Sequence, residues 1–243
     1  MIKIEGTAEI PHLLLNRPKQ ANALNAALLA ELTEAVSQAI RSEARAIVLC
    51  AEGRGFSAGA DLNEVSGQAD DVGVDDRIAA LTDTIVSAPI PVVVALHGYC
   101  MGAAVDVAWA CDFVVATPDV RIALPAARLG LLYSPRALQR LHARLGTRVL
   151  RRLILFSETL TGEEAWRLGV VERVADAAQL RQEANDVAEG AVQAGPAAIA
   201  ASKGFLNAAD VGPIDFEHWE QQRRTLLASK ERQVAVRAKK RTL

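Results

Sequence analysis

The segment from Gly53 to Leu62, with the sequence GRGFSAGADL, carries the clearest chemical signal of this chain. It follows the apolar run 46–50, which is typical of a buried strand. The glycines and small side chains let the backbone turn tightly and approach a ligand closely. No side chain between Phe56 and Ala60 is a plausible acid, base or metal ligand. The chemistry on offer is therefore a backbone N–H that can bind a developing oxyanion.

A second segment has the same organisation. Residues 91–106, with the sequence PVVVALHGYCMGAAVD, predict a buried strand, a glycine-containing turn and the small-residue start of a helix. Two such turns can supply two amide donors to one carbonyl oxygen.

Two further motifs accompany these turns. Residues 16–25 read NRPKQANALN, and a later stretch contains LTGEEA at 160–165 followed by LGVV at 168–171. In this order and at this spacing, the four motifs resemble the crotonase superfamily of enoyl-CoA hydratases and isomerases, over most of the chain. The resemblance implies an α/β fold, a crotonase-like spiral of ββα units with a helical C-terminal region.

The resemblance also implies roles for individual residues. Ala58 and Ala103 match the two oxyanion-hole positions, whose amides hold the thioester oxygen of an acyl-CoA as it becomes enolate-like. Asp106 matches the first of two carboxylates in the hydratase subgroup and is the candidate for proton transfer. The second position falls on Ala126, whose methyl group is neither acid nor base. The resemblance predicts a hydratase/isomerase-type enzyme in which hydration is inefficient.

Other positions concern the acyl group and the coenzyme. Tyr133 lies in the loop that faces the acyl group in similar proteins, as a pocket wall or as a hydrogen-bond donor. No metal is expected, and no cofactor beyond the coenzyme A of the thioester substrate. The residues that the resemblance implies for coenzyme binding are Arg17, Lys19, Ala21, Leu24, Asp61, Leu62, Lys239 and Lys240.

Three functions stay open at this point. The first is enoyl-CoA hydratase/isomerase chemistry, with isomerisation favoured because one carboxylate can shuttle a proton. The second is a non-catalytic acyl-CoA-binding protein that keeps the oxyanion hole and has lost the acids. The third is an acyl-CoA decarboxylase, in which the carboxylate of the substrate leaves and no enzymic base is needed. Asp106 itself has an alternative role as a cap or an ion-pair partner within the helix core.

Composition narrows the class of protein. The 243 residues, 51% of them hydrophobic, suffice for one large domain or a domain with a small appendage. A net charge of −2 argues against nucleic acid as a partner. The range 223–243 nevertheless holds eight Lys or Arg and a single acid, Glu231. This basic end is either a solvated helix or a surface that meets the phosphates of coenzyme A.

The cysteines and the hydropathy of the chain indicate in which cellular compartment the protein is expected. The three cysteines lack CxxC spacing and lie in apolar surroundings, as expected for reduced thiols in a cytoplasmic protein. The uncharged range 84–105 is interrupted by prolines and glycines, so no transmembrane helix is expected. The resemblance further implies a homotrimer or a dimer of trimers.

Periodicity predicts the elements that position these motifs. Gly195 and Pro196 mark the start of a helical part, which divides the chain into 1–194 and 195–243. Strands are expected at 8–15, 46–50, 92–96, 113–116, 121–124 and 171–174. Helices are expected at 26–41, 102–109, 135–145, 147–156, 162–168, 179–194, 196–208 and 216–238, and a mobile acidic loop with a helix at 69–87.

Overall fold

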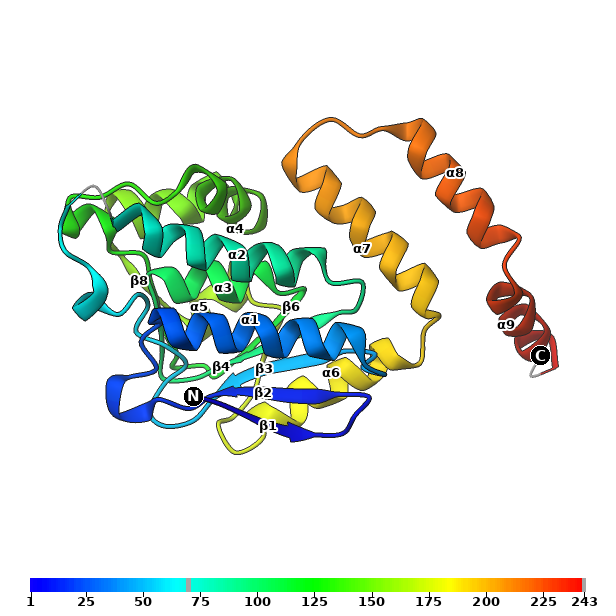
Figure 1. Cartoon of the computed structure of the whole chain (residues 1–243), viewed down its shortest axis with the longest axis horizontal. Helices are drawn as coiled ribbons and strands as arrows, with labels where there is room; N and C mark the ends of the chain where they lie inside the picture. The colour runs from blue at the N-terminus through cyan, green and yellow to red at the C-terminus, as the bar shows by residue number, and fades with distance from the viewer. Residues whose placement is uncertain (69–70, 242–243) are drawn as a thin grey trace.

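A mixed sheet lies at the centre of the computed structural model, which describes residues 1–68 and 71–241 (Figure 1). Its strands, in spatial order, are β1 (Ile2–Gly6), β2 (Pro11–Leu15), β3 (Ile47–Ala51), β4 (Val92–Leu96), β6 (Phe113–Ala116) and β9 (Arg173–Val174). β1 and β2 pair antiparallel, and the neighbours from β2 to β9 pair in parallel. A smaller sheet contains β5 (Tyr99–Met101), β7 (Arg121–Ala123) and β8 (Thr159–Thr161).

Helices connect and cover these strands. They are α1 (Ala26–Arg41), α2 (Val72–Ser87), α3 (Ala103–Ala110), α4 (Pro135–Leu155), α5 (Gly162–Arg167), α6 (Leu180–Val192), α7 (Pro196–Val211), α8 (Phe216–Leu227) and α9 (Lys230–Arg241). Short 3-10 turns occur at η1 (Pro18–Gln20), η2 (Leu62–Glu64) and η4 (Ala126–Leu129). This arrangement confirms the predicted α/β class with a helical C-terminal region.

The central sheet is buried on both faces. In β3, Ile47 and Leu49 join the large core beneath α1, α2 and α3, whereas Val48 and Cys50 join a second core beneath α6. Figure 1 shows these helices on opposite sides of the strands. Side chains of a strand alternate between faces, so a strand covered on both faces is a continuous apolar run, as β3 and β4 are.

Several predicted boundaries need correction. The strand predicted at 8–15 begins only at Pro11, because the chain first turns back from β1 through Gly6, at φ 80°. β1, β5 and β8 are absent from the sequence-based assignment. β1 alternates apolar and charged residues but is a five-residue edge strand without a fully buried side chain, and the other two have three residues each.

The helices predicted at 135–145 and 147–156 are confirmed as the two segments of α4, because the backbone at Gly146, with φ 69° and ψ 159°, is non-helical and separates them. Another helical prediction differs from the structure. The helix predicted at 216–238 is divided into α8 and α9. Of the loop and helix predicted at 69–87, residues 69 and 70 lie outside the described residues, and α2 occupies 72–87.

α7 is fastened to the body by a buried lysine. The ammonium of Lys203 donates to the carbonyls of Ile85 and Ile90, at 3.1 and 3.0 Å, and pairs with Asp112 at 2.7 Å. Beyond α7 the chain continues into α8 and α9, which lie at the outer side of the molecule (Figure 1). Large apolar side chains on these three helices are exposed, namely Leu206, Val211, Phe216, Leu227, Val234 and Val236.

In the described part of the chain, no helix is both long and apolar enough to span a bilayer.

Gly98 links β4 to β5 and tests how tightly this region is packed. Its φ is +61°, and an added Cβ would stand 1.9 Å from the carbonyl oxygen of Arg54. We expect Gly98→Ala to lower the free energy of unfolding by about 2–5 kcal/mol through backbone strain and overpacking. Urea denaturation followed by circular dichroism measures this change.

Gly190→Ala is the matched control. Gly190 lies within α6, and no heavy atom lies within 4 Å of its added Cβ. This change should raise stability by about 0.5–1 kcal/mol. Equal effects of the two substitutions would contradict the close approach at Gly98.

Candidate active site

The two glycine-containing turns meet at one edge of the central sheet. β3 and β4 are parallel neighbours, so their carboxyl ends lie side by side. Backbone hydrogen bonds then join the turns, with Phe56 N donating to His97 O at 3.0 Å and Ser57 N to Tyr99 O at 3.2 Å. Met101 N donates back to Ser57 O at 3.0 Å. The turn after β3 therefore adds a short parallel pairing to β5.

Gly59 brings the first turn against the start of α3. It has a φ of +92°, and a Cβ on it would lie 2.5 Å from Met101 O and 3.3 Å from Ala103 N. The absence of a side chain lets the peptide between Gly59 and Ala60 lie next to the first amide of α3.

Between Phe56 and Asp61, the hydrogen bonds of the first turn leave one amide without a partner among the described residues. Ala58 N donates to Ala21 O at 3.0 Å, and Gly59 N donates to the Ser57 hydroxyl at 3.1 Å. Asp61 N donates to a carbonyl of the early loop. Ala60 N has no hydrogen-bond partner among the described residues. The expectation for Ala58 does not fit this pattern, because an amide already bonded to a carbonyl is not free to bind an oxyanion.

The second turn leaves a free amide at Ala103. This residue opens α3, and its N–H has no partner among the described residues, as usual for the first turn of a helix. The positive end of the helix dipole adds to this donor. The positive φ of 56° at Gly102 turns the chain sharply into the helix. Ala60 and Ala103 thus offer adjacent unpaired donors, a suitable arrangement for one carbonyl oxygen.

Asp106 lies one turn further along α3 and is buried in an ion pair. Its two carboxylate oxygens accept hydrogen bonds from Nε and Nη2 of Arg140 on α4, at 2.9 and 3.0 Å. Arg140 also donates to the Thr82 hydroxyl of α2 at 2.9 Å. The Asp106 side chain is 5% exposed and that of Arg140 is 13% exposed.

This pairing decides the charge of Asp106. Burial raises the pKa of its carboxyl, and the hydrogen bonds and charge of Arg140 oppose that shift. A protonated carboxyl would lose one of two charge-assisted hydrogen bonds and leave a buried guanidinium uncompensated. We infer that Asp106 stays ionised and bound. To accept a proton, Asp106 would first have to break its hydrogen bonds to Arg140, which costs free energy. Its predicted catalytic role stays a prediction.

Tyr133 stands beside the second turn. Its hydroxyl lies 3.6 Å from the position that a Cβ on Gly102 would occupy. The following residues fix it, because Ser134 caps α4 through Ala137 N and Pro135 occupies the first helical position. Burial and the charges of nearby carboxylates raise the pKa of Tyr133. The hydroxyl therefore keeps its proton at neutral pH and is a hydrogen-bond donor.

The position of the second expected carboxylate is apolar in the structure as in the sequence. Ala126 begins η4 and is 2% exposed, so a methyl group fills this part of the core. Metal chemistry has no candidate either, since no cluster of three His, Cys, Asp or Glu in the described ranges could hold an ion.

The early loop is braced against the first turn. Arg17 pairs with Asp61 at 3.2 Å, and both side chains are largely buried. Asn22, which the sequence analysis did not single out, is 1% exposed and donates to the carbonyls of Glu52 and Gly55. Arg17 and Asp61 therefore act on one another in this structure, and their predicted contact with a coenzyme stays a prediction.

The remaining predicted coenzyme residues differ in position. Lys19 is exposed on η1 and Leu62 is 65% exposed beside the first turn, whereas Leu24 is buried. Lys239 and Lys240 lie on α9, on the opposite side of the molecule from the loop before α1 (Figure 1). One chain therefore does not bring these two lysines to Lys19, because α7 and α8 carry α9 away.

Sequence reasoning missed Arg140 and Ala60. Arg140 is 34 residues from Asp106, and no spacing rule connects the two. Ala60 was overlooked in favour of Ala58, although both lie in the same motif. The hydrogen bond from Ala58 to Ala21 depends on the left-handed backbone of the early loop, with φ 51° at Ala21.

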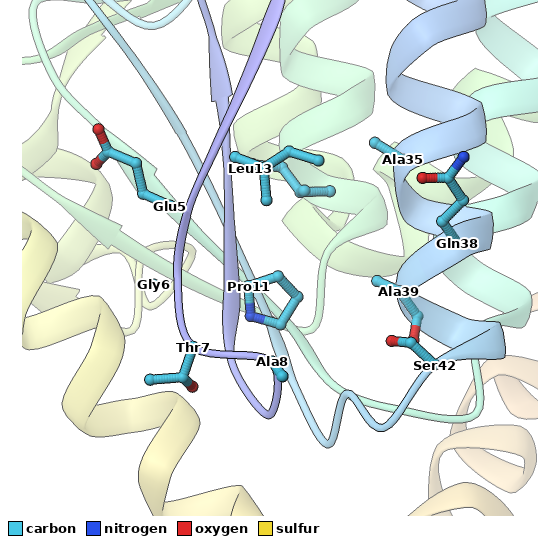
Figure 2. Close-up of a pocket in the computed structure, with 11 residues that line it drawn as sticks. Glu5, Gly6, Thr7, Ala8, Pro11, Leu13, Ala35, Gln38, Ala39 and Ser42 are labelled. Carbon is cyan, nitrogen blue, oxygen red and sulfur yellow. The ribbon is translucent and has the colours of Figure 1, made fainter.

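A separate groove of about 420 Å³ lies between the β1–β2 hairpin and α1. Figure 2 shows Pro11 and Leu13 of β2 opposite Ala35 and Ala39 of α1. Its one carboxylate, Glu5, is paired with Lys3 and Arg181. None of the predicted site residues lines this groove, which offers no convergent donors for a thioester.

Comparisons with known proteins show what this chain is similar to. The enoyl-CoA hydratase/isomerase family model matches residues 5–234. A protein of Mycobacterium bovis named probable enoyl-CoA hydratase is 36% identical over 219 residues, with 90% of this chain and 86% of that protein covered. The 2,3-dehydroadipyl-CoA hydratase of Escherichia coli is 31% identical over 195 residues, which cover 80% and 76% of the two chains.

Solved structures are similar over nearly the whole chain. DspI of Pseudomonas aeruginosa has a TM-score of 0.93 at 26% identity, and the alignment covers 99% of this chain and 94% of that one. The enoyl-CoA hydratase of Bacillus anthracis has a TM-score of 0.90 at 27% identity, with 99% and 96% covered.

The Asp106–Arg140 pair predicts a large, asymmetric mutational response. We expect Arg140→Met to lower the free energy of unfolding by about 3–5 kcal/mol, because it leaves the Asp106 charge buried without a partner. The double variant Asp106→Leu/Arg140→Met should recover much of that loss. Arg167→Ala, which removes an exposed ion pair with Glu163, should cost less than about 1 kcal/mol. Urea denaturation measures all three, and equal losses for Arg140→Met and Arg167→Ala would refute the buried pair.

Proposed function

Because the chain belongs to the enoyl-CoA hydratase/isomerase family, we propose that it binds an acyl-CoA thioester and stabilises the enolate form of its acyl group. The observation that carries this proposal is the pair of adjacent free amides at Ala60 and Ala103. A thioester oxygen held by both would gain hydrogen-bond strength as negative charge develops on it. The Tyr133 hydroxyl would lie beside the same oxygen or the adjoining acyl carbons.

Isomerisation of an enoyl-CoA is favoured over hydration. Moving a double bond needs one group that takes a proton from one carbon and returns it to another. Addition of water by the two-carboxylate route needs a second acid or base, and Ala126 supplies none. The proposal therefore predicts a competent isomerase and a weak hydratase.

A second candidate is a non-catalytic acyl-CoA carrier or sensor. The bidentate hold of Arg140 on Asp106 favours it, because the one carboxylate predicted to move protons is already occupied. In this case the oxyanion hole serves only to bind the thioester. Turnover of any enoyl-CoA by the purified protein separates the two candidates.

The coenzyme and the assembly are part of the same proposal. Lys19 and Leu62 are exposed beside the first turn, where they can meet a phosphate and an adenine. Lys239 and Lys240 would reach such a site only on another copy of the chain. The exposed apolar side chains of α7, α8 and α9 support an assembly of copies, for which we propose a trimer or a pair of trimers in the cytoplasm.

Ala103→Pro tests the oxyanion hole. Proline is well tolerated at the first position of a helix and removes only the N–H that the site needs. We expect isomerisation of a 3-enoyl-CoA to its conjugated 2-enoyl isomer to slow by about 10²–10³-fold. The absorbance of the conjugated product measures the rate.

The matched variant Ala103→Gly keeps the N–H and should retain most of the rate. Circular dichroism spectra of both variants establish that they fold. A folded Ala103→Pro protein with full activity would exclude this amide from catalysis.

Ala126 tests the reaction preference. The wild-type protein should hydrate crotonyl-CoA about 10²–10⁴-fold more slowly than a two-carboxylate hydratase, since one acid–base group is missing. Ala126→Glu should raise that rate, and Ala126→Gln, of the same size but unable to transfer a proton, should not. Rapid hydration by the wild type, or equal gains from both variants, would contradict the assignment.

A further inference from the structure

The proposed reaction lacks a free proton acceptor at the acyl end of the site. Asp106 is tied to Arg140 by two hydrogen bonds, and Ala126 is apolar. A third carboxylate, Asp75 in the first turn of α2, is exposed and lies close enough for its charge to act on Asp106 and Tyr133. It makes no hydrogen bond or ion pair with any residue that the structure describes. We propose that Asp75 is the group that takes and returns the proton at the acyl chain.

The register of α2 points Asp75 toward the site. Thr82, seven residues later, bonds Arg140 and thereby contacts the Asp106 pair. Seven residues make two turns of a helix, so Asp75 lies on the same side of α2 as Thr82, about 10 Å nearer to the helix start. α2 packs along α3, which begins at the oxyanion-hole amide of Ala103. Asp75 thus stands at the exposed edge of the α2 face that packs against α3.

The charges around Asp75 agree with this placement. The negative charge of Asp75 contributes to the raised pKa of Tyr133, whose hydroxyl stands beside the second turn. The pKa of Asp75 is itself raised by partial burial of its carboxyl and by the charges of Asp76 and Asp106. Arg77, on the other side of this turn, is turned toward Glu64, at 3.9 Å. A carboxylate with a raised pKa and no partner is a better base than a paired one.

The proposed proton transfer accounts for every proton and electron pair. The Asp75 carboxylate takes a proton from the α-carbon or γ-carbon of the acyl group, and the C–H electron pair moves into the thioester carbonyl. Its oxygen becomes the enolate oxygen held by the amides of Ala60 and Ala103. The neutral Asp75 carboxyl then returns a proton to the α-carbon or the γ-carbon. This step rests on the proposed enolate chemistry and adds to it the identity of the base.

Exchange of α-hydrogens tests the base without any net reaction. Butyryl-CoA in D2O should incorporate deuterium at its α-carbon in the presence of the wild-type protein, as measured by NMR. Asp75→Asn should lower this exchange rate by about 10²–10⁴-fold. Asp76→Asn removes the same charge one residue on, at a different angle around α2, and should change the rate less than about twofold. Asp75→Glu should restore part of the rate.

The dependence of the exchange rate on pH distinguishes a catalytic role of Asp75 from a purely structural one. Asp75 must be deprotonated to act, so exchange should be present above its pKa and lost as pH falls through it. The inflection should lie above the ordinary aspartate value of about 4, and it should vanish in Asp75→Asn. Calorimetry with butyryl-CoA should give unchanged affinity for this variant.

The outcomes are distinct. Exchange in the wild type with equal rates in Asp75→Asn and Asp76→Asn would overturn the role of Asp75 and leave the enolate chemistry intact. Loss of butyryl-CoA affinity in Asp75→Asn, matching the loss of rate, would make it a binding residue and would also overturn the inference. A wild-type protein that binds butyryl-CoA without exchange would overturn both.

Discussion

The backbone hydrogen bonds through Ser57 hold the turn after β3 against the turn after β4, and every other part of the site depends on that contact. They place the peptide of Ala60 beside the first amide of α3. The approach is close enough that Gly59 and Gly98 have no room for a side chain. The early loop then closes over the junction through Asn22 and the Arg17–Asp61 pair. The site is thus built from main-chain geometry and stabilised by buried polar side chains.

The sequence predicted those parts of the site that local patterns determine. β3 and β4 are apolar runs, and each is followed by glycines and small residues, so both turns were located correctly. Patterns do not determine which amide stays free. That depends on the Ala21 carbonyl, which a left-handed stretch of the early loop directs at Ala58 N. Nor can spacing reveal Arg140, because the kinked helix α4 brings it to Asp106 only in the folded protein.

The surroundings of Asp106 decide whether it can act as the base that its position in the motif suggests. A carboxylate at this point of α3 suggests a base, but a carboxylate that accepts two N–H groups from a buried guanidinium is already stabilised as an anion. Both oxygens of this carboxylate already accept hydrogen bonds from Arg140. The same pair joins α3 to α4 and, through Thr82, to α2. The pair therefore fixes how these three helices pack beside the candidate site.

The proposed oxyanion hole, made of main-chain amides, has a consequence for how such a protein can diverge. Any residue except proline supplies the N–H at positions 60 and 103, so mutational drift there would leave the proposed thioester binding intact. The positions that cannot drift are the glycines whose missing side chains permit the contact. Acid and base groups, by contrast, are lost by a single exchange such as alanine for glutamate. With the proposed site, a lineage on this scaffold could therefore change or lose its reaction many times while it still binds the same coenzyme ester.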